Sequence, residues 1–218
     1  MIQPAVVYNS SRKELLQSFR TRSLLEATRK VIAAGGFDAV TMERVAKEAG
    51  MTKGGIYLYF RNKDELIVSA IEEIASEMLQ QIEAQVDLKA TPWDKLCQTI
   101  RAQLEIMEAQ KDFLRVLLLD RRLLRDSPRG KQARRLLKYR ERHEGRIKNL
   151  LDEGIKQRTF RAMEPGLAAF YINEMTISTA GRRMLGRSAH SLERDAENLI
   201  GFLGFLLRKS ARQSGVSR

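Results

Sequence analysis

A very short turn at Gly50 and Met51, between two helical segments, is the feature that most restricts how this chain can fold. Thr41 is a natural N-cap for the first segment, and Gly50 ends it because glycine readily takes the left-handed conformation found after helices. Thr52 can cap the second segment, so little chain is left for the turn. Helices joined so closely must cross steeply, which predicts a helix-turn-helix, the geometry that places a second helix in the DNA major groove.

The second of these helices is expected to bury one face against the protein core and to present the opposite face to DNA. Ile56 and Phe60 are four residues apart and share a face, so they should pack against the two preceding helices. At about 100° per residue, Leu58 falls opposite them, where leucine is unusual for a solvated surface. Leu58 can instead contact a thymine methyl group, and the flanking Tyr57 and Tyr59 can donate their hydroxyls to phosphates.

Two consecutive glycines, Gly54 and Gly55, open the same helix. Each costs roughly 1 kcal/mol of helix stability relative to alanine. We place both on the outward side, where a missing side chain lets the backbone approach a base edge or a phosphate. The next helix begins at Asn62 in a capping-box-like pattern, with Lys63 at the N-terminal end, where backbone N–H groups favour an anion. Lys63 is either a phosphate contact, which we favour, or a solvated side chain.

A clear helix from about residue 21 to Gly35 precedes the pair. Gly35-Gly36 supplies its stop, and Phe37 then folds back onto the core. Residues 1–19 form a mixed segment with basic residues near its end. That segment is either a frayed terminus or a basic arm that reaches DNA phosphate or the minor groove. Residues of the helix that recur at helical spacing are Leu24, Ala27, Thr28, Val31 and Ile32.

Four motifs agree together in order, spacing and residue type: Gly35-Gly36-Phe37, residues 41–46 (TMERVA), residues 49–54 (AGMTKG) and residues 56–66 (IYLYFRNKDEL). They resemble the DNA-binding domain of the TetR family of bacterial transcriptional regulators. The resemblance covers residues 21–66, about a fifth of the chain.

This resemblance implies an all-α homodimer. A three-helix DNA-binding domain over residues 20–66 follows the arm of residues 1–19, and residues 67–218 form a helical ligand-binding and dimerisation domain. Gly55 departs from the family, in which a hydroxyl residue is common, so no side-chain contact is expected there. Glu43 either reads a cytosine amino group or makes no contact. By position, the implied DNA contacts are Thr41, Met42, Glu43, Thr52, Lys53, Gly54, Gly55, Tyr57, Leu58, Tyr59 and Lys63.

The rest of the chain predicts a body made of helices. A link helix continues from Leu66 to about Leu88, and the next begins at Thr91-Pro92, with threonine as N-cap and proline in the first turn. Further helices are expected over about 112–124, then through Ile155 after a break at 127–128, and from near Pro165 and Ser191. Sparse glycine and proline favour this helical reading.

The last two helices have broad apolar faces, with Gly201 and Gly204 allowing close approach. Such helices can simply complete a monomer's core. In TetR-like proteins the corresponding pair forms a four-helix bundle with the partner subunit, so a homodimer is predicted. Its two recognition helices would lie about 34 Å apart and meet a near-palindromic operator.

A cavity for a small-molecule effector is expected inside this body, although at least half of its candidate residues are equally suited to plain core. The candidates are Leu104, Met107, Phe113, Leu117, Phe170, Tyr171, Asn173, Glu174 and Thr176. The run from Arg121 to Arg142 holds ten positive and two negative residues, a net +8. It is a solvated helix face, the rim of a pocket for an acidic effector such as a fatty-acyl thioester, or a second DNA contact.

Charge and composition limit the class of protein. A net charge of +12 and a pI of about 10.1 indicate an anionic partner: nucleic acid, an anionic membrane or a charged small molecule. No apolar run approaches the roughly 18 residues of a spanning helix, and no signal-peptide core is present. The single cysteine, Cys97, is expected to be a small buried residue and fits a reducing compartment, so we expect a cytoplasmic protein.

Catalysis is not expected. The chain has no phosphate loop, nucleophile elbow or dinucleotide fingerprint. His143 and His190 lie far apart, and neither has a partner at metal-ligand spacing, so no catalytic residue, metal or cofactor is predicted. His143 is interpreted as an exposed or capping residue of the basic helix.

The sequence thus predicts a ligand-responsive transcriptional regulator, most simply a repressor released from its operator by a hydrophobic and anionic effector. A sequence-indifferent architectural DNA-binding protein without a ligand would also be basic and helical, but it would not need so large an apolar body. A basic amphipathic protein at a membrane surface fits less well with the turn-separated helix pair.

Overall fold

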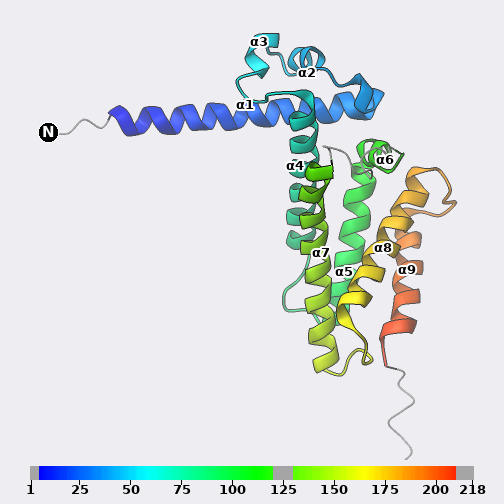
Figure 1. Cartoon of the computed structure of the whole chain (residues 1–218). Helices are drawn as coiled ribbons and strands as arrows, with labels where there is room; N and C mark the ends of the chain where they lie inside the picture. The colour runs from blue at the N-terminus through cyan, green and yellow to red at the C-terminus, as the bar shows by residue number, and fades with distance from the viewer. Residues whose placement is uncertain (1–4, 120–129, 210–218) are drawn as a thin grey trace, which may run out of the picture. The chain divides into compact units, whose positions relative to one another are not determined.

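The computed structural model describes residues 5–119 and 130–209, with side chains described for residues 12–117 and 138–209. The described part is all-α, as predicted, apart from one isolated bridge between Phe160 and Arg208 (Figure 1). It divides into two compact units within α4, between Ile74 and Ala75. Its elements are α1 (Ala5–Gly35), η1 (Phe37–Ala39), α2 (Met42–Glu48), α3 (Lys53–Ile56), α4 (Lys63–Ala84), α5 (Pro92–Ala109), α6 (Lys111–Leu119), α7 (Gly130–Lys156), α8 (Pro165–Met184) and α9 (Leu192–Leu207).

The N-terminal unit packs the apolar stripes of its short helices around α1. Every α1 residue predicted from helical spacing is buried, and the Thr28 hydroxyl is satisfied by donating to the carbonyl of Leu24 at 2.7 Å. Gly36 has φ +73°, a left-handed conformation that stops the helix, and Phe37 is buried as predicted. Ala46 of α2 is 1% exposed, so its small side chain sits inside this packing.

α1 begins at Ala5, well before the start near residue 21 that the sequence predicts. No glycine or proline interrupts the chain from Ala5 to Ala34, so the helix continues toward the N-terminus beyond the core. Residues 12–20 are all exposed, including Leu15, Leu16 and Phe19. Burial periodicity is the signal that marks a helix in a sequence, and it is missing here.

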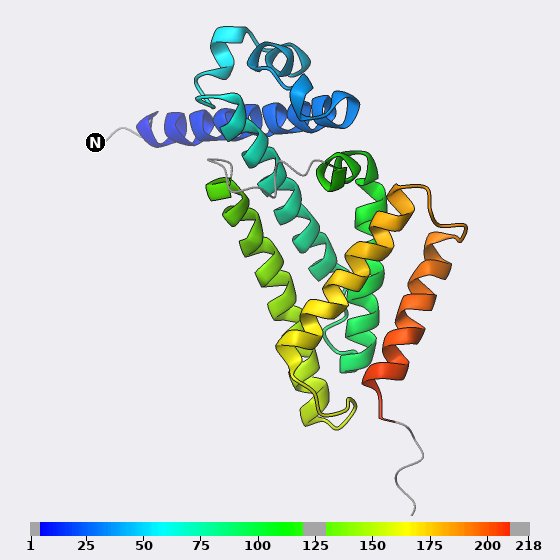
Figure 2. The same ribbon diagram turned by 45° about the vertical axis from the view of Figure 1, so that its right-hand side comes forward.

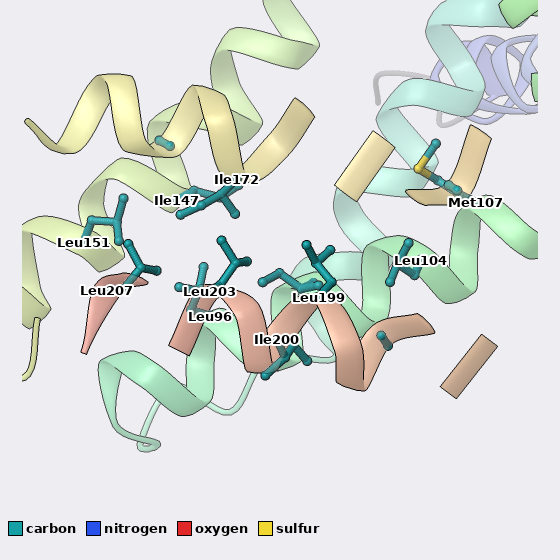
Figure 3. Packing of buried hydrophobic residues seen from close by; sticks show 14 of the residues in the cluster. Leu96, Leu104, Met107, Ile147, Leu151, Ile172, Leu199, Ile200, Leu203 and Leu207 are labelled. Atoms are coloured by element: carbon teal, nitrogen blue, oxygen red, sulfur yellow. The ribbon is translucent and has the colours of Figure 1, made fainter. Parts of the chain in front are cut away.

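The second unit has one large apolar cluster built from α5, α7, α8 and α9. Figure 3 shows Leu96 and Leu104 of α5 near the α9 residues Leu199 and Leu203, with Ile172 of α8 beside them. α8 and α9 lie side by side in both ribbon views (Figures 1 and 2). Burying one fully enclosed leucine stabilises the fold by about 2 kcal/mol, so this cluster dominates the unit's stability.

The helix starts of the second unit follow their sequence signals. Thr91 caps α5 by accepting from Asp94 N at 3.2 Å, and Pro92 occupies the first turn, as predicted. α8 and α9 begin at the expected places, while α4 ends at Ala84 rather than near Leu88. The predicted helix over 112–124 corresponds to α6 up to Leu119, and its remainder lies outside the described residues. None of the described helices is long and apolar enough to cross a membrane.

Cys97 is half-buried against the apolar cluster rather than fully enclosed. Burial raises the pKa of its thiol to about 11. The thiol therefore stays protonated at neutral pH, and its part in the structure is to fill space beside α5.

Candidate nucleic-acid interface

The turn between α2 and α3 is held by backbone hydrogen bonds and two threonine caps. Thr41 Oγ1 accepts from Arg44 N at 3.1 Å, and Thr52 Oγ1 accepts from Gly55 N at 3.1 Å, which confirms both predicted caps. Gly50 has φ +65°, and Met51 N donates to Ala46 O at 2.8 Å, closing the end of α2. The predicted helix-turn-helix is therefore present.

The recognition element is shorter as an α-helix than the sequence predicts. α3 ends at Ile56, and the chain continues in tighter turns, with Leu58 N donating to Gly55 O at 3.3 Å and Tyr59 N to Ile56 O at 3.0 Å. Two glycines and neighbouring aromatic residues give little helix propensity, so three-residue turns compete well here. Ile56 and Phe60 are nevertheless buried, and Leu58 is 81% exposed, as predicted.

The two glycines have different surroundings. A Cβ at Gly54 would meet nothing within 4 Å, whereas a Cβ at Gly55 would lie 3.1 Å from Thr52 Oγ1 and 3.6 Å from Met51 Cε. Gly54 is the one that leaves the outward surface open. Gly55 lies against the cap, so the outward position predicted for it is wrong, and its small size serves the turn.

Charged residues around this element are partly neutralised or fixed in place. Lys53 Nζ lies 3.4 Å from Glu43 Oε2, so Glu43 does not face solvent as an isolated negative charge. At the start of α4, Glu65 N donates to Asn62 Oδ1 at 2.9 Å and Arg61 N donates to Glu65 Oε2 at 2.8 Å. Asn62 therefore caps α4 in the predicted capping-box-like pattern, with the Glu65 carboxylate accepting from the residue before the cap, and together these bonds fix the backbone of Lys63 at the helix start.

All eleven predicted DNA-contact residues lie in the N-terminal unit, but they differ in exposure. Met42 is only 9% exposed, so its side chain belongs to the core and cannot present itself to a groove. Gly55, Tyr59 and Lys63 are half-buried. The exposed members are Thr41, Glu43, Thr52, Lys53, Gly54, Tyr57 and Leu58.

The second unit contains a cavity of about 230 Å³. Of the nine residues predicted to line an effector site, only Met107 and Asn173 are among its lining. Leu104, Phe113 and Thr176 are buried in the surrounding core, and Leu117 is half-buried. The cavity is lined by Ala75, Met78, Leu79, Ile82, Gln103, Met107, Tyr139, Arg140, His143, Asn173 and Ile177.

The other three predicted residues lie toward the surface of α8. Phe170 and Tyr171 are 39% and 53% exposed, and their rings pack edge to face with centroids 5.5 Å apart. Glu174 forms an ion pair with Arg140, whose guanidinium carbon lies 5.5 Å from the centroid of the Phe170 ring. These side chains form an outer layer of α8 instead of a cavity wall.

His143 is buried, which makes its interpretation as an exposed or capping residue wrong. It is 5% exposed, and its Nε2 lies 3.0 Å from Gln103 Oε1. The surrounding basic residues obscured it, yet a signal was available: Tyr139, His143 and Ile147 follow one another at helical spacing on the inner side of α7. Gln103 was also missed, because one polar residue among the apolar residues of α5 does not reveal that its partner lies on another helix.

Most of the basic run between Arg121 and Arg142 lies outside the described residues or has undescribed side chains. Of the described members, Lys138 and Arg142 are exposed. Arg140 points its charge at two carboxylates, donating from Nε to Glu144 Oε1 at 2.8 Å and pairing with Glu174.

Comparisons with known proteins agree with these two units. Residues 24–70 match the family described as bacterial regulatory proteins, tetR family, and residues 89–181 match the tetracyclin repressor-like C-terminal domain. The fatty acid metabolism regulator protein of Bacillus subtilis is 29% identical over 99 residues, which cover 45% of this chain and 51% of that protein. The chain thus spans about half the length of that relative.

Solved structures share the fold. FadR from Bacillus subtilis in complex with stearoyl-CoA has a TM-score of 0.72 at 22% identity, covering 84% of this chain and 96% of that one. A regulator from Saccharomonospora viridis in complex with choline has a TM-score of 0.78 at 19% identity, covering 88% and 100%. With a matched N-terminal domain, a matched C-terminal domain and a helix-turn-helix in place, the chain belongs to the TetR family of bacterial transcriptional regulators.

Proposed function

We propose that this protein is a ligand-responsive repressor that binds a near-palindromic operator as a homodimer and releases it when a small molecule occupies the second unit. The observation that carries the proposal is the exposed recognition surface, with Leu58 81% exposed and open space at Gly54 beside the buried anchors Ile56 and Phe60. An exposed leucine at this place is explained by contact with a base methyl group. Its place of action would be the cytoplasm, where the operator is.

Dimerisation is proposed to use the outer faces of α8 and α9. Each helix has a stripe of exposed apolar residues opposite its buried stripe: Leu167, Phe170 and Tyr171 on α8, and Phe202, Phe205 and Leu206 on α9. A groove of about 440 Å³ between the two helices is lined partly by Phe202. Large exposed apolar patches of this kind mark association surfaces, and two helices from each subunit make a four-helix bundle.

Changing Phe205 to glutamate is expected to convert the dimer to a monomer, since a charge at a 76% exposed aromatic position would be desolvated in the bundle. Leu88→Glu is the matched control, because Leu88 is 83% exposed in the connection after α4. Sedimentation velocity measures the mass, and circular dichroism checks that helix content is retained. A dimeric F205E protein would contradict this assignment of the interface.

Tyr57→Ala and Lys63→Ala are each expected to weaken operator binding by about 5- to 50-fold, because each removes a proposed phosphate contact. Lys89→Ala, in the connection before α5, removes the same charge outside the N-terminal unit and should leave specific binding nearly unchanged. Gel shifts with an operator selected from random DNA, at two salt concentrations and with competitor DNA, provide the measurement. If both variants keep the affinity of the unchanged protein, the docking surface has been assigned incorrectly.

The alternative of a sequence-indifferent architectural protein gains no support from the relatives, which are named as regulators. Their names also point away from enzymes. The relatives in complex with stearoyl-CoA and with choline support a small-molecule effector for this chain. A hydrophobic effector suits the largely apolar cavity wall, whereas its anionic character stays a prediction that rests on the basic run.

A further inference from the structure

Three buried polar side chains from three helices form a chain of hydrogen bonds beside the cavity. Gln103 of α5, His143 of α7 and Asn173 of α8 are 5%, 5% and 2% exposed, and all three line it. Gln103 Nε2 donates to Asn173 Oδ1 at 3.0 Å, and Asn173 Nδ2 donates to Glu144 Oε1 at 3.0 Å. Buried polar groups are costly unless they are paired, so a chain like this has a defined arrangement.

Glu144 determines the direction of every bond in this chain. An ionised carboxylate can only accept, so Asn173 must turn its amide nitrogen toward Glu144 and its oxygen toward Gln103. Gln103 must then offer its nitrogen to Asn173 and its oxygen to His143. Consequently Nε2 of His143 carries the proton and donates to Gln103 Oε1 across 3.0 Å.

His143 is left with one bare acceptor. Burial lowers its pKa to about 4, against the opposing effect of Glu144, so the ring is neutral at pH 7 and has a single N–H. That N–H is on Nε2, which leaves a lone pair on Nδ1. Nδ1 is buried and has no hydrogen-bond partner among the described residues. A buried acceptor is normally paired, so Nδ1 should accept a hydrogen bond from a bound molecule.

The lining and charge of the cavity restrict what can supply this donor. The cavity has about 230 Å³ of space and is open to the surface on one side, and most of its described lining is aliphatic. Among the lining residues that the structure describes, the one guanidinium belongs to Arg140, and it is already engaged by Glu144 and Glu174. The described charges next to the bare acceptor are therefore one positive and two negative, which disfavours a carboxylate at this position.

We infer that the cavity binds a small, largely apolar molecule whose hydroxyl or N–H group donates a hydrogen bond to Nδ1 of His143. This inference rests on the proposed function only in taking that molecule to be the effector. The sequence alone predicts an anionic effector. The feature that the protein recognises on the effector is instead a neutral or cationic hydrogen-bond donor. The aliphatic residues of α4 and Met107 of α5 would enclose the apolar part.

A matched pair of probes tests the donor. Para-propylphenol can donate through its hydroxyl, whereas its methyl ether has nearly the same shape and cannot. Isothermal titration of the full-length protein should give about tenfold or more tighter binding of the phenol, since the ether leaves Nδ1 unpaired. Para-propylaniline, compared with its N,N-dimethyl derivative, repeats the test for an N–H donor. Equal affinity within both pairs, including absence of binding, overturns the inference and leaves a trapped water as the partner of Nδ1.

Two variants test whether the preference for the phenol over its ether depends on Nδ1 of His143. In His143→Gln the amide nitrogen can replace Nε2 as donor to Gln103 while the Nδ1 acceptor is lost, so the preference for the phenol should disappear. In His143→Asn the side-chain oxygen lies near the former Nδ1 position, so part of the preference should remain. A full preference in H143Q would contradict the assignment to Nδ1. Circular dichroism and dimer mass are measured alongside, to confirm that both variants fold.

Operator binding separates the two ideas. Each variant and the unchanged protein are tested by gel shift without any probe. If the unchanged protein shows no specific DNA binding, the proposed repressor function is refuted, regardless of how tightly the probes bind. Intact DNA binding together with no discrimination between phenol and ether refutes the donor inference alone.

Discussion

Replacing Gly154 with alanine is expected to lower the free energy of unfolding by about 2–4 kcal/mol. A Cβ at this position in α7 would lie 2.1 Å from Cδ2 and 2.2 Å from Cε2 of Phe160, far inside van der Waals contact. Phe160 cannot move aside easily, because it is 1% exposed and packs edge to face on Trp93 with ring centroids 6.3 Å apart. Urea unfolding followed by circular dichroism measures the change, and Trp93 fluorescence reports on the same site.

Gly145→Ala on the same helix is the control. A Cβ there meets nothing within 4 Å, so the substitution should stabilise the protein by about 0.5–1 kcal/mol through helix propensity alone. The two glycine-to-alanine substitutions are therefore expected to change the free energy of unfolding in opposite directions, although the chemical change is identical. Similar effects from both substitutions would show that Phe160 does not pack against Gly154 in solution.

Stability is expected to fall by about 3 kcal/mol as the pH is lowered from about 6.5 to 4, because of His143. Burial holds the pKa of this side chain at about 4, against an ordinary value of 6.5. Between these values the unfolded chain binds a proton that the folded chain refuses, so acid favours unfolding in this window. Above about pH 6.5 both states are neutral at this residue, and its contribution no longer changes.

Urea titrations at pH 7, 5.5 and 4 measure the effect, with His143→Gln as the matched variant that cannot titrate. Its unfolding free energy should be nearly flat over the window where that of the unchanged protein declines. Asp195 contributes at lower pH, because burial would raise the pKa of its carboxyl but hydrogen bonds from Ser188 and Arg183 outweigh this and lower it. Parallel pH profiles for both proteins would mean that His143 is solvated.

Local signals were sufficient for most of the fold and for the recognition surface. Thr41, Thr52 and Thr91 cap the helices they were predicted to cap, because a cap depends on neighbours three residues away. Ile56 and Phe60 are buried and Leu58 is exposed, because a short helix that packs on a core buries the residues of one face and leaves those of the opposite face in solvent. Such relations are contained within a few residues of sequence.

Features that depend on distant residues were not predictable in the same way. The length of α1 escaped detection because residues 12–20 are helical without being buried. Phe170 and Tyr171 were assigned to a cavity because an apolar residue on α8 has the same spacing signature on either side of the helix. His143 was misplaced because the basic residues around it outweighed its helical spacing from Tyr139 and Ile147, and because its hydrogen-bond partner, Gln103, is 40 residues away.

The carboxylate of Glu144 has a consequence for how the choice of effector can change. Its Oε1 accepts from Arg140 Nε at 2.8 Å and from Asn173 Nδ2 at 3.0 Å, so a glutamine at position 144 would keep its oxygen at this place to satisfy the arginine. Asn173, Gln103 and His143 would then keep their present directions, and Nδ1 would stay an acceptor. Inverting the polarity of the molecule that the protein senses therefore requires replacing Arg140 as well as Glu144, so two residues together protect the preference for a donor.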